Sequence, residues 1–277
     1  TGYEYDGSEP AEVIIPSEIA GYPVTTIRYL DIVSDKNIKS IYIPKSVTMI
    51  YSSRYLFVPN YVSLESIEIE PGNPIYHSSG NCIIQTAEKQ LIFGSNNSVI
   101  PSDGSVVSIG DNAFYGCNSL KNITIPDNVV SIGYSAFYKC ISLESISLPD
   151  SVTSIGSYAF FYCTSLKNIT IPDGVTSIGR HAFSCCRLLE SITFPDNVTF
   201  ENNFCSFSGC SSLKSINVPY GVTSIYFVNC TSLESITLPN SITNIGRAVF
   251  ENCSSLKSIN IPSSVVSIDE CDFRYFH

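Results

Sequence analysis

The cysteines are the residues of this sequence best suited to chemistry, because a thiolate serves as a nucleophile, a metal ligand or half of a disulfide. The chain contains 11 cysteines in 277 residues. Seven of them recur at nearly constant spacing: Cys117, Cys140, Cys163, Cys186, Cys210, Cys230 and Cys253. Three interpretations compete for this set, namely disulfides, metal ligands or a buried column of small side chains.

The spacing favours the buried column. Equivalent residues in stacked coils lie roughly 4.8 Å apart, a separation that a disulfide tolerates. Their Cβ atoms nevertheless point in parallel directions, and seven members of one column cannot all pair. No C-x-x-C spacing, which is typical of zinc sites, occurs in the chain. We therefore predict no metal site and no cofactor, and we interpret these cysteines as structural spacers of a core.

The remaining residues with chemical potential form no recognisable catalytic pattern. Four cysteines fall outside the regular set: Cys82, Cys185, Cys205 and Cys271. His181 is near Cys185 and Cys186 in "HAFSCC", a conceivable partial metal site that lacks an adjoining carboxylate or second histidine. The total of 11 is odd, which argues against a systematic disulfide framework. With no nucleophile, phosphate-loop or paired-carboxylate motif, we predict no catalytic residues and no enzyme.

The elements that position these cysteines are copies of one repeat. Aligned on proline, seven regular copies from "LKNITIP" to "LKSINIP" end at Pro126, Pro149, Pro172, Pro195, Pro219, Pro239 and Pro262. The steps between them are 23, 23, 23, 24, 20 and 23 residues. Four divergent copies end upstream at Pro16, Pro44, Glu70 and Pro101. A period of this length predicts a solenoid in which each coil contacts only its neighbours.

Within one repeat the apolar pattern predicts mostly β-structure. The alternation of Ile123, Thr124 and Ile125 indicates a half-buried strand, which Pro126 ends because proline has no N–H to donate. A second short extended segment follows over 129–132, and then "SAFYKC" is expected to form about one helical turn. One coil cannot bury its apolar side chains alone, so stacking is expected to form a continuous core.

The repeat resembles a known family. Its pattern L-x-x-I-x-I-P-x-x-V-x-x-I-G-x-x-A-F-x-x-C-x-S is similar to the BspA-type leucine-rich repeat over residues 11–277. The resemblance implies a right-handed superhelix with a parallel β-sheet on one face, and short extended and helical-turn segments on the other. It also implies a secreted or cell-surface protein whose usual role is adhesion or host contact. The implied partners are an extracellular protein, of the matrix or a host surface, or a glycan.

We predict a single leucine-rich-repeat solenoid over 1–277. It comprises divergent coils at 11–70, an inserted β-hairpin at 71–100, regular coils at 101–262 and a degenerate C-terminal coil or cap at 263–277. "NCII" and "QLIF", which flank "QTAEK", form the predicted hairpin. The coil after Pro195 gains one residue and is expected to bulge in "VTFENNFCSF", whereas the coil after Pro219 loses three and is expected to turn more tightly.

The charge balance excludes one class of partner. There are 15 Lys and Arg against 25 Asp and Glu, a net charge of −10, and no basic run. Nucleic acid is therefore excluded as the expected partner, because phosphate binding depends on clustered lysine and arginine. No apolar run approaches the roughly 18 residues of a membrane-spanning helix, so no membrane insertion is expected.

Stacking converts equivalent surface positions into columns. One column alternates strictly in sign: Lys121, Glu144, Lys167, Glu190, Lys214, Glu234 and Lys257. This order places each charge between opposite neighbours, although duplication of a 46-residue pair of repeats explains it equally well. Six aromatic residues of three successive coils are the candidate ligand-binding residues: Tyr115, Tyr134, Tyr138, Tyr158, Phe161 and Tyr162. Such a patch is typical of interfaces, but aromatic rings on an outer turn also cover the core of the adjacent coil.

These observations predict a non-enzymatic recognition or adhesion module of a cell-surface or secreted bacterial protein, which binds protein or glycan ligands through the solenoid surface. The alternative is a structural spacer that holds another domain away from the cell surface.

Overall fold

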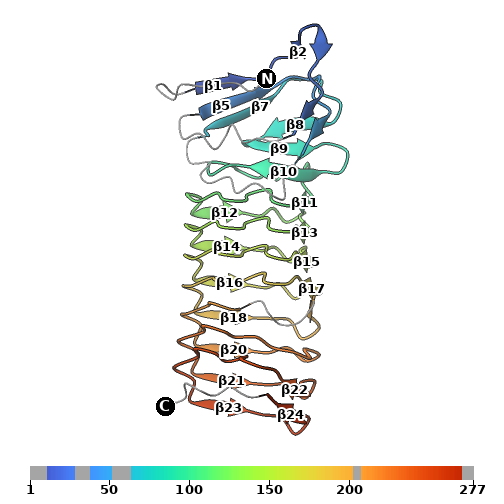
Figure 1. Ribbon diagram of the computed structural model, residues 1–277. Helices are drawn as coiled ribbons and strands as arrows, with labels where there is room; N and C mark the ends of the chain where they lie inside the picture. Colours follow the sequence, from blue (N-terminus) through green and yellow to red (C-terminus); the bar gives the residue numbers. More distant parts are fainter. Residues whose placement is uncertain (1–10, 29–37, 52–63, 202–206, 270–277) are drawn as a thin grey trace.

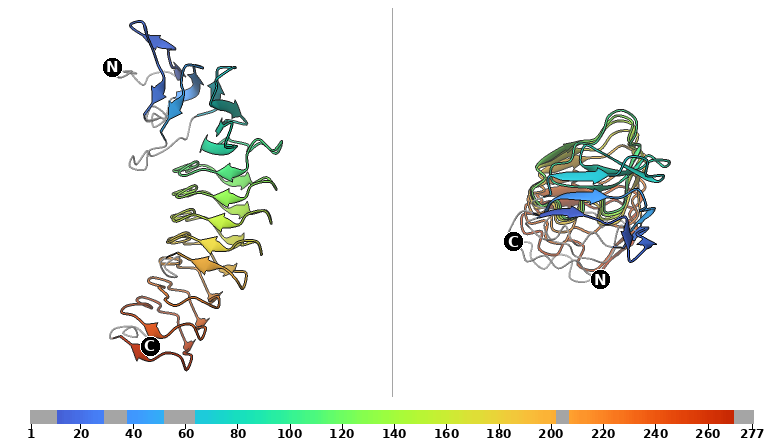
Figure 2. Two further views of the ribbon diagram at one scale, coloured as in Figure 1. Left: turned by 90° about the vertical axis from the view of Figure 1, so that its right-hand side faces the viewer. Right: turned by 90° about the horizontal axis from the view of Figure 1, so that it is seen from above.

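The chain folds as an elongated stack of coils. The computed structural model describes residues 11–28, 38–51, 64–201 and 207–269. The coils lie one above another along the long axis (Figure 1) and largely superimpose when viewed from the end (Figure 2). The predicted solenoid is confirmed, and its described residues are built from strands and turns without a helix.

The first ladder runs down one side of the stack. It contains the strand before each repeat proline: β12 (Asn122–Thr124), β14 (Ser145–Ser147), β16 (Asn168–Thr170), β18 (Ser191–Thr193), β20 (Ser215–Asn217), β21 (Ser235–Thr237) and β23 (Ser258–Asn260). The strands pair in parallel, with Ile123 opposite Ile146 and Ile169 opposite Ile192. The central residue of each strand points into the core and its neighbours face solvent, as the period-2 pattern predicts.

A second parallel ladder lies on the other side. Its two-residue strands are β11 (Ser108–Ile109), β13 (Ser131–Ile132), β15 (Ser154–Ile155), β17 (Ser177–Ile178), β19 (Thr199–Phe200), β22 (Asn244–Ile245) and β24 (Ser267–Ile268). The ladder is interrupted between β19 and β22. The interruption falls in the coil after Pro219, which is three residues short and keeps only an isolated bridge at Ile225.

The N-terminal coils repeat the plan with longer strands. A parallel sheet contains β1 (Ala11–Ile14), β5 (Ile38–Ile43) and β7 (Ser66–Ile69), and a second parallel pair contains β4 (Thr26–Ile27) and β6 (Met49–Ile50). Between β1 and β4 in the sequence, β2 (Glu18–Ile19) and β3 (Tyr22–Pro23) form an antiparallel hairpin. Its two-residue turn has positive φ at Ala20 and Gly21, the geometry that matches the twist of paired strands.

A three-stranded antiparallel meander divides the stack. It consists of β8 (Tyr76–Ser79), β9 (Cys82–Gln85) and β10 (Gln90–Gly94), so the segment predicted as a hairpin contains a third strand. Because side chains alternate along β9, Ile83 packs into the N-terminal core while Cys82 and Ile84 pack into the core of the regular coils. The buried core is therefore two clusters separated by this sheet, and not the single continuous column that the repeat predicted.

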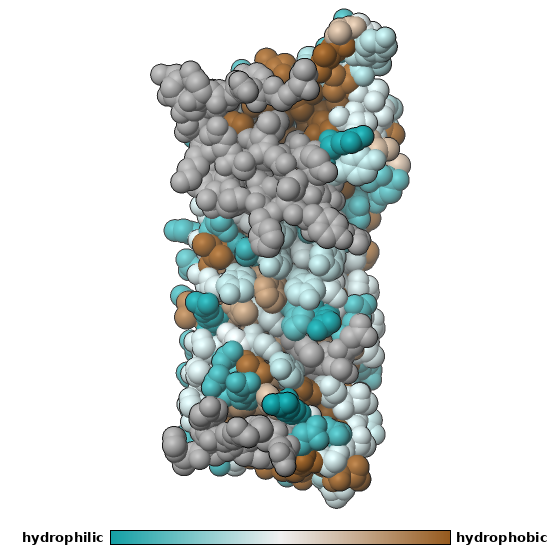
Figure 3. All heavy atoms as spheres, viewed as in Figure 1, coloured by the Kyte–Doolittle hydropathy of each residue, from teal (hydrophilic) through white to brown (hydrophobic). Residues whose placement is uncertain are grey.

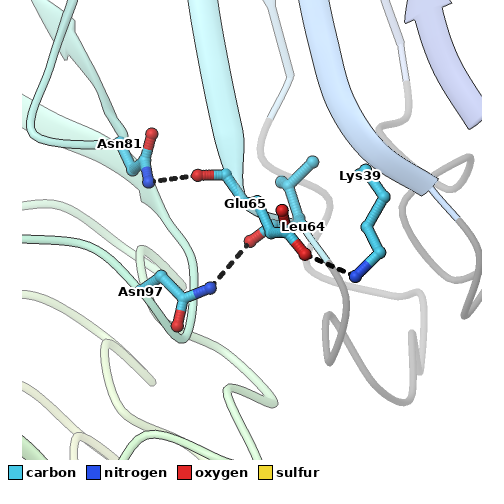
Figure 4. A network of polar contacts seen from close by, with 5 residues as sticks. All are labelled: Lys39, Leu64, Glu65, Asn81 and Asn97. Atoms are coloured by element: carbon cyan, nitrogen blue, oxygen red, sulfur yellow. Dashed lines mark hydrogen bonds and ion pairs between the residues drawn. The ribbon is translucent and has the colours of Figure 1, made fainter. Parts of the chain in front are cut away.

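Polar contacts join the meander to the coil above it. The side-chain amides of Asn81 and Asn97 donate to the main-chain carbonyls of Glu65 and Leu64, and the Glu65 carboxylate pairs with Lys39 (Figure 4). These bonds satisfy backbone groups at the point where the parallel ladder changes to antiparallel pairing.

The predicted helical turn is wrong in detail. The segment from Gly133 to Cys140 forms successive turns, in which Tyr138 N–H donates to Ser135 O at 3.1 Å. Every second N–H group of this segment donates instead to a carbonyl of the next coil, as the N–H of Phe137 does to Ala159 O at 2.7 Å. A helix would satisfy these groups internally and leave the carbonyls of the neighbouring coil unpaired, so stacking selects the turns. The bulge expected over 198–207 lies largely outside the described residues, which omit 202–206, and the predicted cap is described only as far as Asp269.

Candidate functional site: an aromatic surface on three coils

The cysteine column lies in the core. All seven of its members are buried, and the nine described cysteines are free thiols, with Cys185 only half-buried. Each thiol except that of Cys117 donates to the carbonyl of the repeat phenylalanine of the preceding coil, as in the bond from Cys140 Sγ to Phe114 O at 3.1 Å. Cys117 donates instead to Gly94 O. Cys205 and Cys271 lie outside the described residues.

The surroundings of the described thiols from Cys82 to Cys210 suppress their reactivity. Burial raises the pKa of Cys140, Cys163 and Cys186 well above the usual thiol range, and it raises the pKa of Cys82 to about 11. A protonated, buried thiol is a poor nucleophile and a poor metal ligand. No three His, Cys, Asp or Glu side chains among the described residues are grouped so that they could hold a metal ion. His181 contacts Ser184 Oγ through Nδ1 at 3.1 Å, and its ring packs against Tyr158.

The charge column is assembled in register. Main-chain hydrogen bonds link its successive members, as from Glu144 N–H to Lys121 O at 2.9 Å. Two close ion pairs form, between Lys214 and Glu190 at 3.5 Å and between Lys257 and Glu234 at 2.9 Å. The hydrogen bond from Lys257 lowers the pKa of Glu234. All seven side chains are exposed, so each pair contributes about 0–1 kcal/mol and the column carries no net field of one sign.

The six candidate aromatic residues come together on one surface, hereafter the aromatic surface. Tyr115 stacks on Tyr138 with ring centroids 4.7 Å apart and an interplanar angle of 6°. Tyr138 stacks in turn on Phe161 at 5.1 Å. A second row packs edge-on beside this stack, with Tyr158 at 5.7 Å from Tyr134 and 5.5 Å from Phe161. All six are half-buried or exposed, so their rings cover the coils below and also face solvent.

The sixth ring and two cations complete the aromatic surface. Tyr162 packs against Phe161 at 5.2 Å, and the guanidinium of Arg187 lies 5.8 Å from the Tyr162 ring centroid. Lys139 Nζ lies 5.6 Å from the Tyr138 ring. Burial raises the pKa of Tyr115 to about 12 and also raises the pKa of Tyr138, so both phenols remain hydrogen-bond donors near neutral pH.

The backbone under this surface is unusual for tyrosine. The residue before each column cysteine has a positive φ in all seven coils: Gly116, Lys139, Tyr162, Cys185, Gly209, Asn229 and Asn252. Glycine and asparagine adopt this left-handed conformation at least cost, whereas bulky side chains rarely occupy it. Tyr162, at φ 62°, departs from that preference, as Lys139 and Cys185 also do, and Tyr158 departs from it at φ 60°, where Asn112 precedes it two coils earlier. One coil thus holds two tyrosines in a strained conformation on the aromatic surface.

Sequence reasoning missed three features of these surfaces. The charge column extends upstream, because Lys39 and Glu65 hold the same repeat position and form an ion pair. Arg187 joins the aromatic surface through packing that spacing does not reveal. The left-handed position was visible in the sequence as a recurrence of glycine and asparagine before the cysteine, and that signal could have singled out Tyr162.

The view in Figure 3 shows hydrophobic and hydrophilic atoms mixed in small patches over the regular coils, with more hydrophobic atoms near β1 and β2. Ile14 on β1 and Ile19 on β2 are exposed. Within the described ranges, no helix has the length and apolar character needed to cross a membrane.

The sequence matches one family model. The model for the BspA type leucine rich repeat region matches residues 94–205 and 203–277 and counts six copies. No curated protein sequence matches the chain significantly.

Solved structures share the fold. A leucine-rich repeat protein from Eubacterium ventriosum is 25% identical with a TM-score of 0.61, over 85% of this chain and 58% of its own. The chain therefore spans little more than half the length of that protein. A T. pallidum leucine-rich repeat protein is 32% identical with a TM-score of 0.50, over 66% of this chain and 87% of its own. A leucine-rich repeat protein from Bacteroides ovatus is 26% identical with a TM-score of 0.52, over 96% of this chain and 84% of its own.

Proposed function

The chain belongs to the BspA-type leucine-rich repeat family, and on that premise we propose that it is a non-enzymatic recognition module of a secreted or cell-surface bacterial protein. Its binding surface is the aromatic surface defined above. The ligand class that this surface supports best is an extracellular protein, of a matrix or a host cell surface.

The observation that carries the proposal is the pair of tyrosines in left-handed backbone conformation. A bulky residue at positive φ costs of order 1–2 kcal/mol, and some of the other coils avoid this cost with Asn112, Gly116 or Asn229. The left-handed conformation is itself common to the coils, since Lys139 and Cys185 adopt it on either side of Tyr162 and His181 adopts it after Tyr158; what distinguishes this coil is that tyrosine occupies both positions. Strain retained on a surface is a signature of binding sites, where side-chain identity matters more than local stability.

The packing of the rings favours a protein over a glycan. A sugar stacks on the open face of an aromatic ring, but the facing sides of Tyr115, Tyr138 and Phe161 cover one another at 4.7–5.1 Å. The stack therefore presents ring edges, phenol groups and the flanking Lys139 and Arg187 to solvent. Tyrosine and arginine are the residue types most enriched at the centres of protein interfaces.

The test compares wild type with a Tyr162→Asn variant. Asparagine occupies this repeat position at Asn229 and Asn252, so the substitution relieves strain while it removes one ring. We expect its free energy of unfolding to stay within about 1 kcal/mol of wild type, because relief of strain offsets the lost contact with Phe161. Binding to the responsive member of a panel of fibronectin, laminin, collagen and fibrinogen is expected to weaken about tenfold or more.

The matched control is Tyr226→Asn, which removes an exposed tyrosine from the short coil away from this surface. It is expected to bind as wild type does. The triple variant Tyr138→Ser, Phe161→Ser and Tyr162→Ser, shown by circular dichroism to be folded, should abolish binding. Absence of binding across the protein panel and a glycan array would refute the proposal and favour the alternative function, a spacer that carries another domain.

A further inference from the structure

A groove opens where the first ladder breaks. Strands β18 and β20 belong to separate sheets, whereas every other neighbouring pair from β12 to β23 is hydrogen-bonded. The break coincides with the step of 24 residues between Pro195 and Pro219, although the repeat register is kept, since Lys214 N–H still donates to Glu190 O and Ile216 is buried like Ile192. The groove runs along the proline corners of three successive coils, with a volume of about 250 Å³. Its walls are Phe194 to Asp196, Asn217 to Tyr220, and Thr237 to Pro239.

Two departures from the repeat meet in this groove. Asp127, Asp150, Asp173 and Asp196 follow the proline in four successive coils, but the fifth coil has Tyr220 at that position. Tyr220 is 76% exposed, so its ring face is open to solvent, unlike the rings of the aromatic surface. Phe194 replaces the isoleucine, valine or leucine found at this strand end in the other regular coils and lines the groove together with Val218 and Leu238.

The polar groups of the groove are available to a ligand. Asn217 and Thr237 are paired across β20 and β21, both exposed, and Asp196, which lies in the coil before them, is exposed as well. Within the described residues, no side-chain hydrogen bond or ion pair engages the Asp196 carboxylate, the Asn217 amide or the Thr237 hydroxyl. Together they offer a strong acceptor, an amide that donates and accepts, and a hydroxyl.

We infer that this groove is a second binding site, which takes one neutral pyranose ring of a glycan. The exposed face of Tyr220 stacks on the apolar C–H face of the sugar, and Asp196, Asn217 and Thr237 bind its hydroxyls. The volume is slightly below the range of drug-sized pockets, which fits a single ring. Acidic sugars are excluded, because none of the ten described lining residues is a cation and one is a carboxylate. The site is independent of the aromatic surface and extends the proposed protein recognition to carbohydrate.

Saturation-transfer NMR on the whole chain tests the site. The probes are the methyl glycosides of glucose, galactose, mannose and N-acetylglucosamine, with glucuronic and N-acetylneuraminic acids as anionic comparisons. We expect transfer to at least one neutral sugar and none to the acids. Tyr220→Asn, which installs the residue of Asn240 in the next coil, should weaken binding about tenfold or more, whereas Tyr220→Phe should retain it.

The control is Tyr22→Asn, since Tyr22 is equally exposed at 77% but lies on β3. It should bind sugar as wild type does, and so should Tyr162→Asn. Loss of protein binding in Tyr162→Asn and loss of sugar binding in Tyr220→Asn therefore test the aromatic surface and the groove separately. No transfer to any neutral sugar would overturn the inference. Equal binding by wild type and Tyr220→Asn, or tighter binding of the acids, would overturn it as well.

Discussion

Removal of one thiol from the core should change the alkaline stability of the array in a predictable direction. Cys163 lies at the centre of the regular coils, fully buried, and its Sγ donates to Phe137 O at 3.2 Å. Burial raises its pKa far above the usual thiol value. The substitution Cys163→Ala removes the sulfur and leaves a small cavity. Near neutral pH we expect it to lower the free energy of unfolding by about 2 kcal/mol.

The pH dependence follows from proton linkage. Above about pH 8.5 the thiol ionises in the unfolded chain but stays protonated in the folded core. The unfolded state then binds fewer protons, so the free energy of unfolding falls by about 1.4 kcal/mol per pH unit for each such thiol. The stabilisation is complete below the unfolded pKa and is lost as pH rises. Between about pH 8.5 and pH 10 the wild type loses about 2 kcal/mol through Cys163, a loss that the alanine variant does not suffer.

The assay is guanidinium unfolding, followed by circular dichroism under a reducing agent, at several pH values from about 7 to 10. The penalty of Cys163→Ala should shrink to near zero at the alkaline end. The matched control is Val152→Ala, a fully buried, non-titrating substitution in the same coil, whose penalty should not depend on pH. If the two penalties change in parallel with pH, the thiol is not held protonated by the core and the reasoning fails.

Two further predictions concern how the coils stack. A methyl group on Gly179 would lie 2.1 Å from Ser157 N, whereas at Gly246, which follows the short coil, the nearest atom is Val249 Cγ2 at 4.0 Å. Gly179→Ala should therefore lower the free energy of unfolding by roughly 1–3 kcal/mol. Gly246→Ala should leave the free energy of unfolding unchanged or raise it slightly. Equal losses of stability for the two variants in thermal unfolding would contradict this prediction. Lys167→Glu would place three glutamates in succession in the charge column and should lower the free energy of unfolding by less than about 1 kcal/mol. The difference from wild type should vanish at high salt. A loss of stability that does not depend on salt would show that charge is not its cause.

The sequence was sufficient to predict the solenoid because its period reports packing directly. Ile123 and Ile146 occupy the same repeat position, and stacking makes them strand partners. The buried cysteines could be placed for the same reason, since a position repeated seven times with a small apolar residue can only be a column. The charge column followed from the same alignment.

The local conformation of the turn could not be predicted in this way. "SAFYKC" has the composition of a helical turn, but its N–H groups have two possible sets of acceptors, one within the coil and one in the coil below. Phe137 N–H donates to Ala159 O, a contact 22 residues distant that local propensity does not encode. The division of the core by β9 was also hidden, because the assignment of Ile83 and Ile84 to different cores depends on what lies on each side of the sheet.

Regular stacking also explains where specificity can reside in such an array. A consensus side chain is constrained by two identical neighbours, so Phe160 must fit between Phe137 and Phe183 and has no freedom to serve a ligand. Freedom exists where a side chain faces solvent or where the repeat is broken, and there a residue that stacking would disfavour requires another reason to be present. Tyr162 in a left-handed conformation and Tyr220 in place of aspartate are such residues, on different faces of different coils. The consensus thus builds the support, and the departures from it mark the two surfaces at which binding should be sought first.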